Sequence, residues 1–188
     1  MNKKIFVSVL LAILMLAFGC TTTGTRSGDS DVTRRSIDAD ADAALSRLYA
    51  QVAGSEQMVR QARGVLVFPS VLEAGFVFGA SRGNGVLRVG GKTVSYHATT
   101  SGSWGLQAGA QSTAVFILFM TDEALKRFQD SRGWTAGTDA SVTLLSVGAS
   151  AQVTTATAQQ PVVGYVLSNR GLMAGITLDG TRITRLDL

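Results

Sequence analysis

Short apolar runs separated by glycine-containing turns fill the middle of this chain and limit it to a β-rich fold. Residues 65–68 are apolar and precede Pro69, which predicts a buried strand that stops at the proline. Gly83-Asn84-Gly85 and Gly90-Gly91 each predict a tight turn between antiparallel strands. The other strands are expected at 74–81, 86–89, 93–98, around 104–106, and at 114–120, 140–148, 162–167, 172–178 and 182–186.

The composition agrees with a folded, glycine-rich β protein. The 188 residues include 21 glycines but only 2 prolines, and 16% are charged, which is low for a disordered chain. Glycines inside strands are typical of bends, bulges and close backbone approach. We therefore expect a strongly curved sheet or a barrel.

Three segments are expected to be helical. Ser36 is a candidate N-cap for a first helix that ends near Gly54, with Asp38 and Asp40 in its first turn. A second short helix is expected at 55–63, and a third at 121–132. The apolar residues of the first helix fall on one stripe: Ile37, Ala41, Ala44, Leu45, Leu48 and Val52.

These elements predict an α+β fold. N-terminal helices pack on a curved, mainly antiparallel, glycine-rich β-sheet or barrel, and one further helix lies near 121–132.

The first twenty residues have the layout of an export signal. Lys3 and Lys4 precede the stretch 5–18, which is apolar except for Ser8 and shorter than the roughly 20 residues of a membrane-spanning helix. Residues 16–20 (LAFGC) resemble the cleavage region of a bacterial lipoprotein, in which Cys20 becomes the lipidated first residue. A lipidated cysteine anchors a protein to a membrane without spanning it. The alternative is an ordinary secretory signal with an incidental cysteine.

The expected division of the chain is a signal peptide at 1–19, a flexible tether at 20–35 and one domain at 36–188. Cys20 is the only cysteine, so no intramolecular disulfide is possible. Thr21 stands where an inner-membrane retention signal has Asp, which favours the outer membrane of a two-membrane bacterium.

Two motifs resemble catalytic sites, but the residues around them do not match what such sites require. Residues 79–83 have the spacing of a serine nucleophile elbow, but a hairpin is expected next instead of a helix, and His97 is the only histidine. Residues 91–93 resemble the end of a phosphate-binding loop, but the first glycine of that motif is displaced by one position.

No metal site is expected either. A lone His97 offers no ligand cluster, and we expect it in a strand, at the surface or hydrogen-bonded. Asp38, Asp40 and Asp42 lack the glycine and terminal glutamate of a calcium loop. We therefore expect no catalytic residue, no metal and no cofactor, and a protein that is not an enzyme.

The formal charge of +4 is too small to indicate a nucleic-acid partner.

Seven blocks of sequence, in order, resemble the SYLF domain family. This domain binds lipid and regulates actin in some eukaryotic endocytic proteins, and it has many bacterial lipoprotein relatives. The resemblance covers roughly residues 40–188. The blocks are GVLVFPS at 64–70, AGFVFG at 74–79, GNGVL at 83–87, GLQAGAQS at 105–112, VFILFMTDEAL at 115–125, GWTAG at 133–137 and GLMAGITLDG at 171–180.

The resemblance implies membrane or phosphoinositide binding through the N-terminal helical region and its basic residues. In this chain those residues are Arg47, Arg60 and Arg63, and the last two are expected to share a helix face because they are three apart. The alternative is that these arginines form an ordinary solvated face.

Two functions stay open. The chain is either a membrane-anchored lipoprotein whose domain binds anionic phospholipid or phosphoinositide-like headgroups, or a structural or protein-interaction lipoprotein of the cell envelope. The expected partners are membrane lipid, through the Cys20 anchor and through the domain, and an envelope protein.

Overall fold

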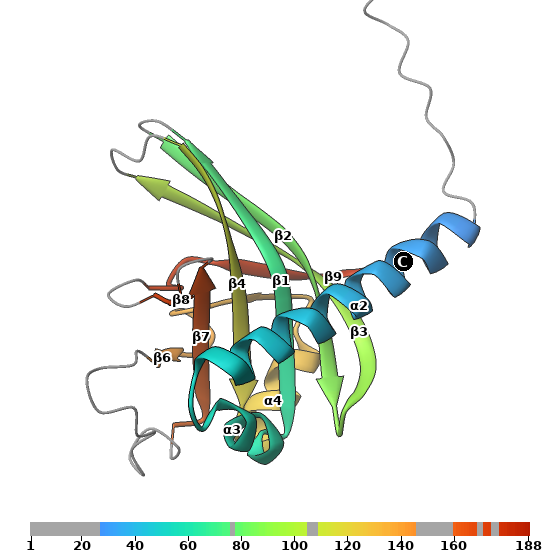
Figure 1. Ribbon diagram of the computed structural model, residues 1–188, viewed down its shortest axis with the longest axis vertical. Coiled ribbons are helices and arrows are strands. Elements are labelled where there is room, and N and C mark those ends of the chain that lie inside the picture. Colours follow the sequence, from blue (N-terminus) through green and yellow to red (C-terminus); the bar gives the residue numbers. More distant parts are fainter. Residues whose placement is uncertain (1–26, 76–77, 105–108, 146–159, 169–170, 174–176) are drawn as a thin grey trace, which may run out of the picture.

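The computed structural model describes residues 27–75, 78–104, 109–145, 160–168, 171–173 and 177–188. In this part of the chain three helices accompany one nine-stranded sheet, so the expected α+β class is confirmed (Figure 1). The helices are α2 (Ser27–Gln51), α3 (Ser55–Gln61) and α4 (Asp122–Asp130). The strands are β1 (Gly64–Gly75), β2 (Phe78–Val89), β3 (Lys92–Trp104), β4 (Gly109–Phe119), β5 (Gly133–Thr135), β6 (Thr143–Leu144), β7 (Val162–Ser168), β8 (Gly171–Leu172) and β9 (Arg182–Leu186).

The sheet is curled and mainly antiparallel, as expected. Its order is β5-β9-β3-β2-β1-β4-β7-β6, with β8 also paired to β7. Among the described strands only β6 and β7 pair in parallel. Because this order ends at β5 and β6, the described strands form an open sheet and not a closed barrel.

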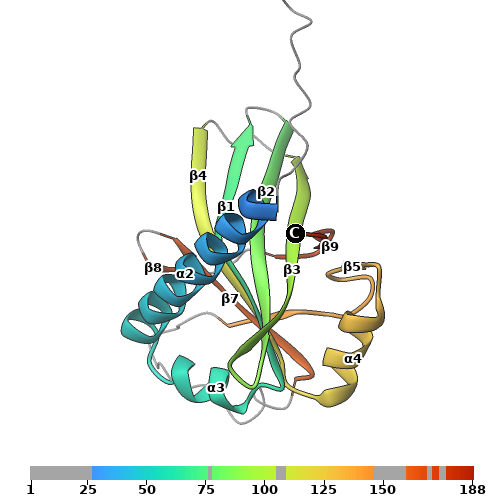
Figure 2. The ribbon, with the colours of Figure 1, turned by 90° about the vertical axis from the view of Figure 1, so that its right-hand side faces the viewer.

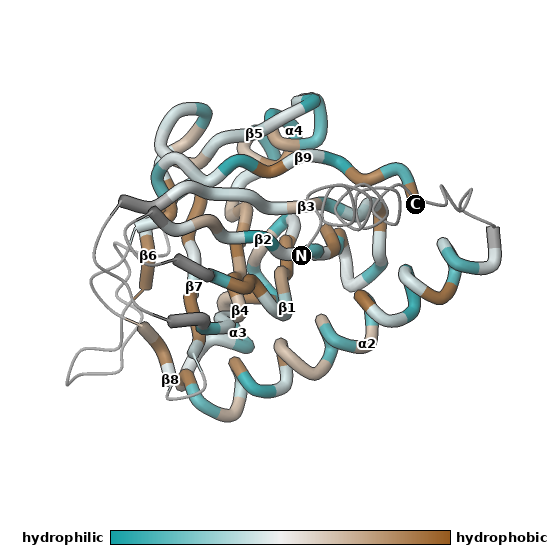
Figure 3. Tube along the Cα trace, turned by 90° about the horizontal axis from the view of Figure 1, so that it is seen from above, coloured by the Kyte–Doolittle hydropathy of each residue, from teal (hydrophilic) through white to brown (hydrophobic). Residues whose placement is uncertain are grey.

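The two faces of the sheet are covered by different helices. Helix α2 crosses one face, and α4 lies on the other (Figures 1 and 2). Figure 3 shows hydrophobic and hydrophilic residues alternating along α2, which lies beside the layer of long strands. The predicted apolar stripe from Ile37 to Val52 is buried, and it packs with the Val67, Phe116 and Tyr165 side chains of the sheet.

The start of the first helix was predicted wrongly. Helix α2 begins at Ser27 instead of Ser36, so residues 27–35 of the expected tether are helical. The Thr33 hydroxyl donates to the Asp29 carbonyl at 2.8 Å, and Arg34 pairs with Asp31 at 3.5 Å. Once the apolar stripe holds the helix on the sheet, adding polar turns needs no new nucleation event, so the helix extends past the buried stripe.

Pro69 does not end the first strand, because β1 continues to Gly75. The pairing of β1 shifts by a residue at the proline, between Val67 and Ser70 against β2 and between Phe68 and Val71 against β4. Proline has no N–H to donate, and a bulge places it where the ladder needs no donor. The bulge lets one long strand replace the short one that we expected.

Gly83-Asn84-Gly85 is not a turn either. All three residues lie inside β2 and pair with β3, and Gly83 and Asn84 also pair with β1. The reversal between β1 and β2 falls within 74–81, which we expected to be one strand.

Other local predictions are confirmed. Gly90 and Gly91 connect β2 and β3 with positive φ values of 57° and 77°. Thr121 caps α4, since its hydroxyl accepts a hydrogen bond from the Ala124 N–H at 3.2 Å. The strand expected at 114–120 is buried between β1 and β7.

Candidate functional site

A groove lies between α2, α3 and the turn that joins β2 to β3. We call it the helix groove; its volume is about 490 Å³. Apolar side chains form much of its wall, and Asp42, Arg60 and Arg88 supply its charge. The lining residues are Asp42, Leu45, Ser46, Tyr49, Val59, Arg60, Ala62, Val65, Arg88, Gly90 and Gly91.

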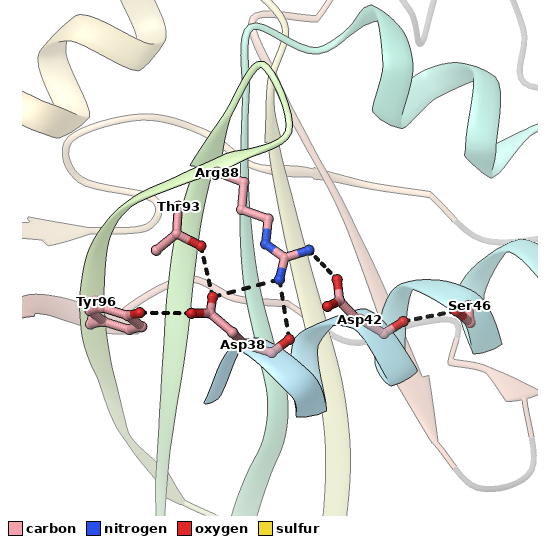
Figure 4. A network of polar contacts seen from close by, with 6 residues as sticks. All are labelled: Asp38, Asp42, Ser46, Arg88, Thr93 and Tyr96. Atoms are coloured by element: carbon pink, nitrogen blue, oxygen red, sulfur yellow. Dashed lines mark hydrogen bonds and ion pairs between the residues drawn. The ribbon is translucent and has the colours of Figure 1, made fainter. Parts of the chain in front are cut away.

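A polar network holds α2 in place beside this groove (Figure 4). Arg88 of β2 forms ion pairs with Asp38 and Asp42 of α2, and one guanidinium nitrogen also donates to the Asp38 carbonyl at 3.1 Å. Two groups of β3 donate to the Asp38 carboxylate, the Thr93 hydroxyl at 2.7 Å and the Tyr96 hydroxyl at 2.8 Å. The network joins the helix to two strands and sets one wall of the groove.

The electrostatics of the network keep Arg88 charged and Tyr96 neutral. The Arg88 side chain is only 15% exposed. Burial acts to lower its pKa, but the hydrogen bond and charge of Asp42, together with Asp38, raise it overall. Burial, together with the hydrogen bond to Asp38, raises the pKa of Tyr96 to about 12. Arg88 is therefore a fixed positive charge in the groove wall.

The predicted basic residues lie apart from one another. Arg60, with its side chain 76% exposed, is on the rim of the groove and pairs with Glu56 at 2.5 Å. Arg47 is exposed on α2. Arg63 follows the end of α3 and faces Asp122 at 3.7 Å. The expectation that Arg60 and Arg63 share a helix face was wrong, because α3 ends at Gln61 and the chain is extended from Ala62.

Sequence reasoning missed Arg88, Thr93 and Tyr96 as partners of α2. We assigned Asp38 to the first turn of a helix, yet it lies in the interior of α2 and faces the sheet. Asp38 and Asp42 are one helical turn apart and so share a helix face, and this spacing could have predicted one cationic partner for both.

His97 is a buried strand residue with a hydrogen-bond partner. It is 6% exposed, its Nε2 lies 2.9 Å from the Ser95 hydroxyl, and its ring centroid lies 4.9 Å from that of Phe128. Burial, with a smaller contribution from the charge of Arg185, lowers the pKa of His97 to about 4. In the described residues no cluster of three or more His, Cys, Asp or Glu side chains is placed to hold a metal ion.

The remaining predicted residues have separate places. Ser81, the centre of the elbow-like motif, lies in β2 and shares a hydrogen bond of 2.6 Å with Ser101. Cys20 lies outside the described residues. Of the helices that the structure describes, none has the length and apolar character needed to cross a membrane.

Comparison with known proteins finds similarity over much of the chain. Residues 100–187 match the family model Ysc84, described as "Las17-binding protein actin regulator". LAS seventeen-binding protein 3 and Protein YSC84, both of Saccharomyces cerevisiae, are each 28% identical to this chain over 147 residues. The match covers 71% of this chain and 31% of each relative, so the chain spans about a third of the length of these curated relatives.

Proposed function

Because the chain belongs to the SYLF family, which the Ysc84 model describes, we propose that it is a binding protein that contacts anionic lipid headgroups at a membrane surface. The helix groove is the contact site, with Arg60 at its rim. Arg47 and Arg63 lie outside the groove lining and add positive charge for a longer-range attraction to the bilayer. The protein is not an enzyme in this proposal.

The observation that carries the proposal is the combination of charge and apolar surface in one groove. Leu45, Val59 and Val65 offer apolar contact, while Arg60 at the rim offers a guanidinium group that can bind phosphate oxygens. Each cation near an anionic bilayer contributes about 1 kcal/mol to binding. Glu56 competes for Arg60, but an exposed ion pair of this kind contributes at most about 1 kcal/mol and exchanges easily.

The proposal includes the anchor and the location. Residues 1–19 are removed as a signal peptide, Cys20 carries the lipid, and the protein is exported and held on a membrane. The outer membrane is favoured over the inner one by Thr21. Residues 20–26 and the projecting start of α2 then connect the lipid to the domain.

Vesicle flotation of an unlipidated chain tests lipid binding. The chain carries Cys20→Ser and is mixed with vesicles of phosphatidylcholine alone or of phosphatidylcholine with phosphatidylglycerol. We expect binding only to the anionic vesicles, with a loss as salt rises because exposed charges are screened. Arg60→Glu with Arg63→Glu should weaken binding at least tenfold.

The matched control is Arg127→Glu with Arg132→Glu, which makes the same charge change on the α4 side of the sheet. It should bind much better than the double variant near the groove. Equal losses in both double variants, or no binding of the parent chain at low salt, would reject the groove as a lipid site.

A protein partner is the second candidate function, and it is favoured by the description of the matching family and the name of one relative, which both refer to Las17 binding. In this case the domain is a structural or protein-interaction lipoprotein of the envelope. Crosslinking in intact cells should then capture one partner protein, while the purified chain ignores both kinds of vesicle.

A further inference from the structure

A second cavity lies on the opposite face of the sheet from the helix groove. We call it the inner cavity; its volume is about 470 Å³, within the usual range for small-molecule sites. It is lined by the α4-side faces of β1–β4, β7 and β9 and by residues 173 and 177–179. Its apolar lining consists mainly of Phe68, Val71, Val115, Ile117, Val166 and Ile183.

Strand register arranges the lining in rows that change from polar to apolar. One row crosses four neighbouring strands and is entirely polar: Gln111, Glu73, Ser81 and Ser101. The next row contains Thr113, Val71 and Thr99. Beyond it, Phe68 and Val115 face each other across β1 and β4. The cavity therefore has a polar end and an apolar end, as a site for an amphiphilic molecule requires.

Two hydroxyl groups in the middle row are free to meet a ligand. Thr99 and Thr113 are 2% and 5% exposed, and neither hydroxyl has a hydrogen-bond partner among the described residues. A hydroxyl that faces a cavity without a protein partner can hydrogen-bond to a ligand or a water there. In the polar row, Gln111 donates to Glu73 at 2.7 Å.

The charge of the inner cavity is negative. Glu73 and Asp179 line it, and the described lining contains no Lys, Arg or His. These carboxylates repel an anionic ligand and attract a cationic one. The inner cavity thus differs from the helix groove, whose lining contains Arg60 and Arg88 as well as Asp42.

We propose that the inner cavity binds a small cationic amphiphile, a primary amine with an apolar chain. The chain lies against Phe68, Val115 and Ile183, and the ammonium group lies at the polar row beside Glu73. This site is separate from the proposed lipid contact and uses none of the groove residues.

Titration calorimetry with three probes of equal chain length tests the proposal: n-octylamine, n-octanol and octanoate. We expect the amine to bind at least about tenfold more tightly than the carboxylate, because the ionised carboxylate is repelled by both acidic groups. The alcohol should lie between them. Equal binding of all three probes, or no binding of the amine, overturns the proposal.

Two variants locate the site. Glu73→Gln keeps an acceptor for Gln111, and Asp179→Asn keeps the size of the side chain. Each should weaken octylamine binding by up to about fivefold, the range for one partly exposed charge pair, without changing octanol binding. Asp130→Asn removes an exposed carboxylate of α4 and is the matched control.

Thr113→Phe places a ring in the cavity and should abolish binding of both octylamine and octanol. If this variant fails to fold, the Glu73 and Asp179 variants still test whether octylamine binds in the inner cavity. Unchanged octylamine affinity in both of those variants contradicts the assignment.

Discussion

Two glycines in the interior of β2 have no side chain because neighbouring β1 leaves no room for one. A Cβ at Gly83 would lie 2.6 Å from the Ser70 carbonyl oxygen. A Cβ at Gly85 would collide with the Val67 carbonyl and the Phe68 ring. The bulge at Pro69 brings the β1 backbone this close, so these glycines are needed for close packing and not for a turn.

We predict that Gly85→Ala lowers the free energy of unfolding by about 2–3 kcal/mol, because the new methyl group has to displace backbone as well as a ring. Urea denaturation measures this change. Gly102→Ala on β3 is the control, since nothing lies within 4 Å of its Cβ. There the lower entropy of the unfolded chain should leave stability unchanged or slightly higher. Similar results for the two variants would contradict the packing argument.

Burial makes His97 a pH-dependent element of stability. Its pKa is lowered to about 4 in the folded protein, against about 6.5 when unfolded, so the unfolded chain takes up a proton first as pH falls. The neutral His97 ring therefore makes its full contribution to the free energy of unfolding above about pH 6.5. This contribution is lost as the pH falls from 6.5 to 4.

From this shift we predict that lowering the pH from 7 to 5 costs the parent protein about 2 kcal/mol more than it costs a His97→Gln variant. Urea denaturation at both pH values provides the measurement. A parent and variant with the same pH dependence would show that the ring is not held neutral.

At the scale of elements, α2 is docked by two independent means. Its apolar stripe packs on the sheet, and Arg88 of β2 binds both Asp38 and Asp42. The stripe positions the helix over the strands, while the ion pairs give its rotation and register a directional constraint.

Removing the Arg88 guanidinium leaves two aspartates of α2 without their cationic partner. We predict that Arg88→Met destabilises the protein by about 1.5–3 kcal/mol, the range for hydrogen bonds to charged groups. Arg82→Met, on the same strand and exposed, should change stability by less than about 0.5 kcal/mol. Thermal unfolding followed by circular dichroism compares them, and equal effects would mean that the network contributes nothing specific.

At the scale of the whole molecule, one sheet separates two sites of different chemistry. The α2 side carries the helix groove with Arg60 and Arg88, and the α4 side carries the inner cavity with Glu73 and Asp179. Because the sheet lies between them, a membrane contact through the groove leaves the other face free for a second ligand.

The anchor is tested on the whole chain in a two-membrane bacterium. We predict that the parent protein stays in the membrane pellet after a high-salt wash, whereas Cys20→Ser is extracted, because salt removes electrostatic contacts but not a lipid chain. Thr21→Ser is the neighbouring control and should behave like the parent. Extraction of the parent and the Cys20 variant to the same extent would rule out lipidation.

Features that depend on neighbours a few residues apart could be predicted from the amino-acid sequence alone. The buried stripe of α2, the Thr121 cap and the Gly90-Gly91 turn were all predicted, because periodicity, capping and left-handed backbone are local properties. Tertiary structure decided the rest. Pro69, Gly83 and Gly85 take their roles from the register of paired strands, and strand register is not a local property. Arg88 meets Asp42 across 46 residues of chain, and the helix groove exists only because the folded sheet brings these distant residues together.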